Sequence, residues 1–330
     1  MEFQTLSASH QQDVQHLVAY QYQSALAAFP HLPSVHVFPS PFLVNTMGFG
    51  VVARADDATK GYIVGNHYAN FFGSTGARGI HVPLEGLGIA DGETSKTVRL
   101  LYSDAAHQWV TAGILNHCLT IYAHQTEVKE AFFQLGFGLR LTDAYRSLVN
   151  HTDLPVPLDG EVDFVEHKSS VRRIHPLYLA LVDHLQQSPM FMVRENTLSE
   201  DEFVEHDMKQ RARYFVARKR QSGDILAYMK VTETGENFIT RAPSMRSISG
   251  AYCLPEYRGT GLASKLLSFL CHQLEAEGFA QLGVDYETFN PCAWGFWNKF
   301  FQPYTYGLSR HIDDQALLLL TQDDEFQDRR

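Results

Sequence analysis

The chain has 330 residues, about twice the length of a typical single domain, so two domains are expected. Hydrophobic residues make up 45% of the sequence and charged residues 19%, which suffices for buried cores and argues against a disordered chain. The 27 basic and 37 acidic side chains give a net charge of −10, which argues against nucleic acid as the main partner.

The sequence features that report on location indicate the cytoplasm. No apolar run approaches the roughly 18 residues that cross a bilayer, and the N-terminus lacks the basic-then-apolar order of a signal peptide. The four cysteines lie far apart without a CxxC pair, which favours free thiols in a reducing compartment. We therefore expect a cytoplasmic protein with no membrane partner.

The first half of the chain alternates between helix-type and strand-type patterns. Its expected elements are a helix over 13–29, strands over 50–54, 61–64 and 79–82, a helix over 96–112, a strand over 118–123 and a helix over 127–135. Residues 148–160 carry two prolines and an Asp-Gly turn signal, which makes this segment the best candidate for a linker. We therefore place the domains at residues 1–150 and 151–330.

The second half has a similar order of elements. We expect helices over 171–187 and 262–277, a helix that starts with a capping box at Ser199, and strands over 214–218, 225–231, 247–254 and 282–286. The piece that starts at Gly113 aligns without a gap on the piece that starts at Gly278, a shift of half the chain. Identities are few, but both pieces have the same strand-loop-helix plan. Two related α/β domains with mixed sheets are the preferred interpretation.

A glycine-rich turn follows the strand that ends near Pro255. It reads Arg258-Gly259-Thr260-Gly261-Leu262-Ala263 and opens an amphipathic helix. Glycines allow close approach of the backbone, so several N–H groups can converge on a diphosphate at the helix N-terminus. The turn has neither the Rossmann nor the Walker pattern. Arg258 either neutralises the ligand or ties the loop down.

The pattern Arg258-x-x-Gly261-x-Ala263 resembles the pyrophosphate loop of the GCN5-related N-acetyltransferase (GNAT) superfamily. Downstream, Asn290 and a helix containing Trp297 also resemble that superfamily, in particular a bacterial subgroup with two tandem GNAT domains. The resemblance implies a mixed sheet with splayed central strands and an acyl-CoA, here acetyl-CoA, inserted between them. The sequence is therefore identified as a tandem GNAT-like protein, with a clear match in part of its second half and a looser one in its first half.

The resemblance also assigns cofactor contacts. The pantetheine arm is expected along the backbone of Tyr252, Cys253 and Leu254, the pyrophosphate on the amides of Arg258, Gly259, Thr260, Gly261, Leu262 and Ala263, and further contacts at Asn290 and Trp297. Residues 151–330 would thus be the catalytic domain.

The same half-chain shift places Glu93-Thr-Ser-Lys-Thr-Val98 opposite the glycine-rich turn. This stretch has no glycine, and its β-branched residues crowd a backbone that should approach phosphate closely. We interpret residues 1–150 as a degenerate GNAT-like domain that acts as scaffold, substrate wall or dimer surface, which leaves a homodimer open. A shift in register through the nearby Gly86, Gly88 and Gly92 is the rival explanation.

The proton-transfer groups are less well specified. Trp297 stands where many GNAT enzymes have the tyrosine that protonates the leaving thiolate, and an indole N–H is a poor acid. Nearby substitutes are Tyr304 and Cys253, while period-2 alternation places Asp285 and Glu287 on one face of a strand. Either carboxylate is interpreted as a base acting through water, as an anionic clamp for a cationic amine, or as a structural group.

The leading functional prediction is an N-acetyltransferase that moves an acetyl group from acetyl-CoA to a small amine or a peptide N-terminus. Two alternatives stay open: a condensing step like that of mycothiol synthase, and a CoA-sensing or scaffold protein without catalysis. The histidines show no metal-binding spacing, so no metal cofactor is predicted.

Overall fold

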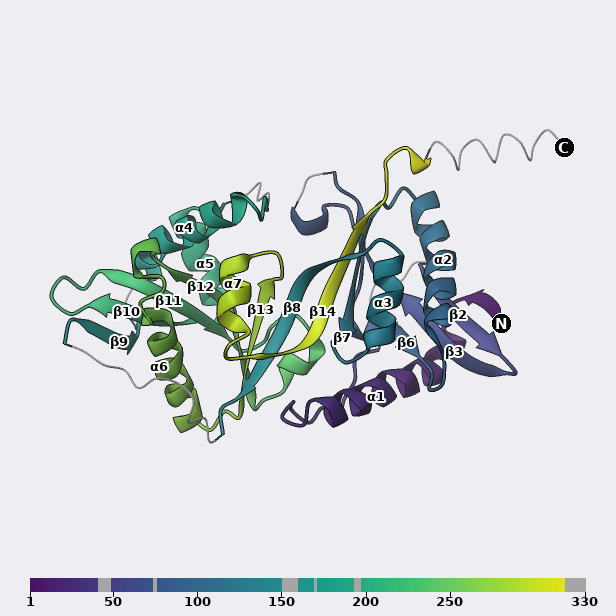
Figure 1. The fold of residues 1–330 in the computed structure, drawn as a ribbon, viewed down its shortest axis with the longest axis horizontal. Helices are drawn as coiled ribbons and strands as arrows, with labels where there is room; N and C mark the ends of the chain where they lie inside the picture. Colours follow the sequence, from purple (N-terminus) through teal and green to yellow (C-terminus); the bar gives the residue numbers. More distant parts are fainter. Residues whose placement is uncertain (41–48, 74–75, 150–159, 169–170, 193–196, 318–330) are drawn as a thin grey trace. The chain divides into compact units, whose positions relative to one another are not determined.

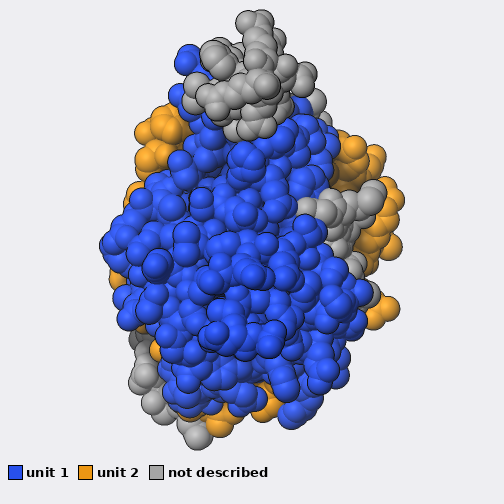
Figure 2. Space-filling view, turned by 90° about the vertical axis from the view of Figure 1, so that its right-hand side faces the viewer, with its two compact units in different colours: residues 1–30, 36–142, 304–330 blue, residues 31–35, 143–303 orange. Residues whose placement is uncertain are grey.

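The computed structural model describes residues 1–40, 49–73, 76–149, 160–168, 171–192 and 197–317 (Figure 1). The chain forms two compact units, which Figure 2 colours blue and orange. The first unit contains residues 1–30, 36–142 and the segment from 304 onward, and the second contains 31–35 and 143–303. Each unit combines helices with a mixed sheet, which confirms the predicted α/β class. No helix in the described ranges is long and apolar enough to cross a membrane.

Each unit includes a strand contributed by the other half of the chain. β14 (Gln302–His311) pairs antiparallel with β7 (Asn116–Tyr122) in the first unit, from Thr305↔Tyr122 to His311↔Asn116. Conversely, β8 (Gly138–Ser147) enters the second unit at Asp143. The units therefore differ from the sequence ranges 1–150 and 151–330, while most of the predicted linker lies outside the described residues. Alternation of residues predicts a strand but not which strand it will pair with.

The first unit has helices on both faces of its strands. β1 (Glu2–Thr5), β2 (Gly50–Ala55), β3 (Ala58–Val64) and β6 (Leu87–Ile89) are neighbours in that order, and β4 (Asn66–Tyr68) and β5 (Gly79–Val82) lead to β7. One core packs α2 (Ser95–Thr111) and α3 (Thr126–Gln134) on side chains such as Val51 and Ile63. The alternate residues Val52 and Val64 face α1 (Gln11–Ala28).

The second unit repeats this plan. β9 (Val162–Glu166), β10 (Arg213–Lys219), β11 (Ile225–Thr232) and β12 (Met245–Cys253) are antiparallel neighbours, and β13 (Gln281–Glu287) lies parallel to β12. α6 (Leu262–Ala276) and α7 (Pro291–Trp297) share one core with Phe215, whereas α4 (His175–Gln186) and α5 (Glu200–Gln210) share another with Tyr214 (Figure 1). Successive β10 residues thus face opposite helical layers.

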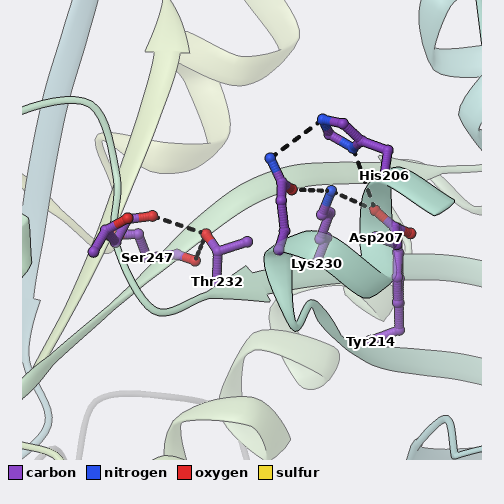
Figure 3. Close-up of polar contacts among 8 residues, drawn as sticks. His206, Asp207, Tyr214, Lys230, Thr232 and Ser247 are labelled. Carbon is purple, nitrogen blue, oxygen red and sulfur yellow. Dashed lines mark hydrogen bonds and ion pairs between the residues drawn. The ribbon is translucent and has the colours of Figure 1, made fainter. Parts of the chain in front are cut away.

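A buried polar network anchors α5 to the sheet (Figure 3). Asp207 on α5 is 3% exposed, and its carboxylate accepts hydrogen bonds from the Tyr214 hydroxyl and from Lys230 Nζ, the latter at 2.6 Å. Lys230 Nζ also donates to Gln210 Oε1 at 2.8 Å. Burial, reinforced by Asp207, raises the pKa of Tyr214, so its phenol stays protonated and donates. The pairing compensates two charges that would be costly to bury alone, and it fixes α5 over β10 and β11.

Most elements that the sequence predicts are present within a few residues. The strand over 79–82 has the predicted bounds, and the capping box at Ser199 is formed: Ser199 N donates to Glu202 Oε2 at 2.9 Å, and Glu202 N donates to Ser199 Oγ at 3.4 Å. The helix predicted from residue 171 instead begins at His175, after a short 3₁₀ turn. The prediction omitted β1, β4, β6, β8 and β9, of which β4 and β6 are very short.

Candidate active site

The two central strands of the second unit separate partway along their length. β12 and β13 pair from Met245↔Gln281 to Ile248↔Val284, although β12 continues to Cys253 and β13 continues to Glu287. On its other edge, β12 remains paired with β11 as far as Cys253↔Ala227. Within the described residues, the edge of β12 that faces β13 therefore has no strand partner over residues 250–253. This gap corresponds to the splayed sheet that the resemblance implies.

A β-bulge marks the start of the gap. The register between β11 and β12 shifts between Lys230 and Val231, whose partners are Gly250 and Ile248, so Ser249 is the extra residue. Ser249 is exposed, unlike its buried neighbours Ser247 and Ile248. Bulges bend a strand and redirect backbone groups, and they are frequent beside active sites.

The turn after β12 presents a helix N-terminus to this gap. Gly259 and Gly261 have φ angles of 76° and 85°, which residues with a side chain adopt only at a cost. A Cβ at either position would meet no protein atom within 4 Å, so the backbone conformation requires glycine there, whereas protein packing does not. Gly261 is the N-cap of α6 and has no side chain of its own, the Leu262 amide donates to Thr260 Oγ1 at 3.4 Å, and the first turn of α6 contains no acidic residue. Its amide groups are therefore oriented to receive an anion.

Arg258 ties this turn to the preceding strand. Its Nε donates to the Cys253 carbonyl oxygen at 3.0 Å, and its guanidinium lies 5.2 Å from the centroid of the Tyr252 ring. Thr260 adds a second tie, because its hydroxyl donates to the Tyr257 carbonyl oxygen at 2.7 Å. Arg258 thus ties the loop to β12, which is one of its two predicted roles. Its guanidinium also places a positive charge beside the glycine-rich turn.

A cavity of about 520 Å³ occupies this region. It is lined by most of the residues predicted to bind the cofactor, namely Tyr252, Cys253, Arg258, Gly259, Gly261, Leu262, Ala263, Asn290 and Trp297. The other two, Leu254 and Thr260, are not part of its lining. The structure thus brings these separated segments together around one cavity.

The α7 side of the cavity is formed by Asn290 and Trp297. The Asn290 side chain caps α7, with its Oδ1 accepting hydrogen bonds from Cys292 N at 3.1 Å and Ala293 N at 3.3 Å. Trp297 packs edge-on against Phe301, with their ring centroids 5.4 Å apart. Burial raises the pKa of the Cys253 thiol, which therefore remains protonated at neutral pH.

The three predicted catalytic residues lie outside the lining of this cavity. Asp285 and Glu287 share a face of β13 opposite to Val284 and Tyr286, as the alternation predicted. Tyr304 belongs to the first unit and is 1% exposed, and its carbonyl oxygen accepts from Ala123 N at 2.8 Å. The sequence placed Tyr304 beside the site because it follows α7, but the chain enters the first unit at this residue.

The environment of Asp285 is unusual for a carboxylate. Burial raises its pKa well above the ordinary value, and the neighbouring Glu236, Asp143 and Glu287 raise it further. Asp285 is the first β13 residue beyond the last pair with β12. A carboxylate whose pKa is raised in this way is a candidate for acid–base chemistry, and Asp285 lies where the two strands separate.

His184 was missed by the sequence analysis. It lies near the end of α4 and lines the cavity together with Leu181. Burial lowers the pKa of its imidazole, and the Arg258 guanidinium lowers it further, while a hydrogen bond with Asn290 acts in the opposite direction. Nothing in the helical pattern around His184 distinguishes it from the other histidines. Only the fold brings α4 to the glycine-rich turn, which follows much later in the chain.

The corresponding turn of the first unit is already occupied by its own side chains. Thr94 is the N-cap of α2, and its Oγ1 accepts from Lys96 N at 3.3 Å. The Glu93 carboxylate accepts from Thr97 Oγ1 at 2.6 Å and lies 3.7 Å from Lys60 Nζ. The residue before the N-cap is therefore an ion-paired glutamate in the first unit, whereas in the second unit it is Thr260, whose Oγ1 accepts from Leu262 N at 3.4 Å.

This comparison corrects the register of the internal alignment at the turn. The shift of half the chain holds for β7 with β13 and for the starts of α3 and α7. The N-caps Thr94 and Gly261 lie two positions further apart than this shift, so Asp91, and not Glu93, is the counterpart of Arg258. Gly92, with φ 74°, then matches Gly259. An ungapped alignment cannot detect a difference in turn length.

Comparisons with known proteins point to one family of enzymes. Residues 179–301 match the model of the Acetyltransferase (GNAT) family. A GCN5-related N-acetyltransferase from Sphaerobacter thermophilus has a similar structure, with a TM-score of 0.57 at 11% identity over 94% of this chain and 95% of that one. A tandem GNAT protein from the clavulanic acid biosynthesis pathway gives 0.50 at 16% identity, over 94% and 98% of the two chains. The sequence matches none of the curated proteins with which it was compared.

The structural similarities reach across both units, whereas the family match is confined to the second unit, which contains the cavity. At identities of 11% and 16%, the two similar structures establish the fold alone. Taken with the splayed strands and the glycine-rich turn, the match at residues 179–301 identifies a domain of the Acetyltransferase (GNAT) family within the second unit.

Proposed function

We propose that the second unit is an N-acetyltransferase that uses acetyl-CoA as donor and a small molecule or peptide amine as acceptor. The observation that carries this proposal is the continuity of three features around one cavity: the edge of β12 that has no strand partner, the glycine-rich turn and the N-terminus of α6 without an acidic residue. The pantetheine amides pair with residues 250–253, and the diphosphate binds the first amides of α6. Asn290 lies beside the pantetheine arm, between the acyl group and the diphosphate.

The reaction needs a neutral amine and a stabilised oxyanion. The amine nitrogen attacks the thioester carbonyl carbon, the C–N bond forms, and the C–S bond then breaks to release the CoA thiolate, which takes up a proton from water. We expect backbone N–H groups beside the Ser249 bulge to donate hydrogen bonds to the developing oxyanion. Asp285 accepts the amine proton, directly or through a water molecule.

The acidic surroundings of Asp285 favour a cationic acceptor. Glu236, Glu287 and Asp143 all raise its pKa, and no basic side chain of the described ranges is among the groups that shift it. An ammonium group that enters this region would gain favourable interactions with several carboxylates before it loses its proton. We infer that the acceptor carries a positive charge, as a primary amine does at neutral pH.

Turnover tests this function directly. The full chain is incubated with acetyl-CoA and a panel of cationic, neutral and acidic amines, and released thiol is measured. We expect thiol release that depends on the amine and is fastest for cationic acceptors, with product mass increased by one acetyl group. Binding of acetyl-CoA without release for any amine would contradict an enzyme and favour a CoA sensor, for which Trp297 in place of the usual tyrosine is the supporting observation.

We further propose that the first unit is a scaffold or substrate wall without a cofactor site. Glu93 and Thr94 already occupy the N-terminus of α2, and a carboxylate beside a diphosphate is repulsive. Calorimetric titration of the full chain is therefore expected to give one acetyl-CoA site per chain. Two equivalent sites would show that the first unit has retained its cofactor site.

A further inference from the structure

His184 has no counterpart among the cofactor contacts that the sequence predicts. It reaches the cavity from α4, and Arg258 reaches the same cavity from the glycine-rich turn. We propose that His184 is part of the acyl-CoA site and takes up a proton when the cofactor diphosphate binds. This inference rests on the proposed function, because it assumes that the diphosphate lies on the turn at Gly261.

The charges around His184 are defined by the elements that surround it. Asp183 lies beside it on α4, Arg258 projects from the turn, and Asn290 reaches it from the start of α7. The other titratable groups lining the same cavity are Tyr228, Tyr252, Cys253, Tyr257, Cys292 and Lys299. Arg258 is the cation that disfavours a second positive charge on His184.

Without cofactor, burial and then Arg258 hold the pKa of His184 below its ordinary value of 6.5, so the imidazole is neutral at pH 7. A bound diphosphate brings negative charge close to Arg258 and offsets its repulsion of the imidazolium. The pKa of His184 must therefore rise on binding, which couples binding to protonation. Affinity is highest below the pKa of the free protein and falls as pH rises through the higher pKa of the complex.

Calorimetry of the full chain tests this coupling. Acetyl-CoA is titrated between pH 6 and 8 in pairs of buffers with different ionisation enthalpies, which gives the protons taken up per ligand bound. We expect uptake by the wild type and less uptake by His184→Gln. Each unit of rise in the pKa of His184 adds about tenfold to the affinity at low pH. His206→Gln, at an exposed histidine of α5, is the matched control and should behave as the wild type.

The cofactor itself contains a group that titrates in this pH range, and a second ligand that lacks this group serves as the control. The 3′-phosphate of CoA also binds protons in this range, so the titration is repeated with dephospho-acetyl-CoA, whose uptake should still depend on His184. If His184→Gln binds too weakly to titrate, NMR of the wild-type imidazole gives its pKa with and without acetyl-CoA, and a rise is expected.

Two results overturn the proposal in distinguishable ways. Equal proton uptake by the wild type and His184→Gln, or an unchanged imidazole pKa in the complex, contradicts this inference alone. Failure of the wild-type chain to bind acetyl-CoA overturns the proposed function and this inference with it.

Discussion

Gly261→Glu is expected to weaken acetyl-CoA binding by more than about 2 kcal/mol, roughly 30-fold in Kd. Gly261 lines the cavity and is the N-cap of α6, so a carboxylate introduced there competes for the amides that receive the diphosphate and repels it. The positive φ of 85° adds backbone strain. Calorimetric titration with acetyl-CoA measures the loss.

Gly278→Glu separates the loss of the site from the effect of strain. Gly278 has a φ of 90°, a Cβ there would meet no atom within 4 Å, and it follows the other end of α6, outside the cavity lining. The two variants should lose similar stability in thermal unfolding, whereas only Gly261→Glu should lose affinity. An undiminished affinity in Gly261→Glu would remove the turn from the cofactor site.

Asp285→Asn is expected to lower kcat by about 10²- to 10⁴-fold, the usual contribution of a general base. Asparagine keeps the shape of the side chain but cannot accept the amine proton. In the wild type, kcat should fall at low pH as Asp285 becomes protonated, with a midpoint set by its raised pKa. This fall in kcat should be absent from Asp285→Asn. A higher KM for the amine at unchanged kcat would instead show that Asp285 only attracts the cation.

The same substitution should leave the protein more stable at alkaline pH. Because burial raises the pKa of Asp285 in the folded state, that state binds the proton more tightly than the unfolded chain does. This contribution is complete at low pH and is lost as pH rises through the folded-state pKa. Melting temperatures of Asp285→Asn should therefore decline less with pH than those of the wild type. Asp224→Asn, in the exposed turn after β10, is the control and should change neither activity nor this pH dependence.

The cofactor side of the site could be predicted from the sequence because its determinants are local. A strand, two glycines that need positive φ, and an amphipathic helix are encoded within residues 247–277, and the structure reproduces that order. Asn290 and Trp297 follow on the next strand-helix pair. When a binding site depends on the backbone conformation of one continuous segment, the amino-acid sequence of that segment is enough to predict it.

The rest of the site depends on partners that lie far apart in the sequence. His184 reaches the cavity only because α4 packs on the sheet, and the raised pKa of Asp285 depends on Asp143 and Glu236 from separate segments. Tyr304 follows α7 on the next strand, as expected, but it belongs to the first unit and is not part of the cavity lining. The turns before α2 and α6, at Thr94 and Gly261, also differ in length. An insertion in a loop does not change the hydrophobic pattern of the flanking elements, so the sequence pattern did not reveal this difference.

The exchange of strands between the units has a consequence for biosynthesis. The sheet of the first unit needs β14, whose residues 304–311 leave the ribosome long after β7, their pairing partner. Domains usually fold in the order in which they are synthesised, but here the edge of β7 stays unpaired until the second unit has emerged almost completely. During that interval an exposed strand edge is a site for wrong pairing, and a nascent chain of this protein is therefore a natural client for a chaperone that shields such edges.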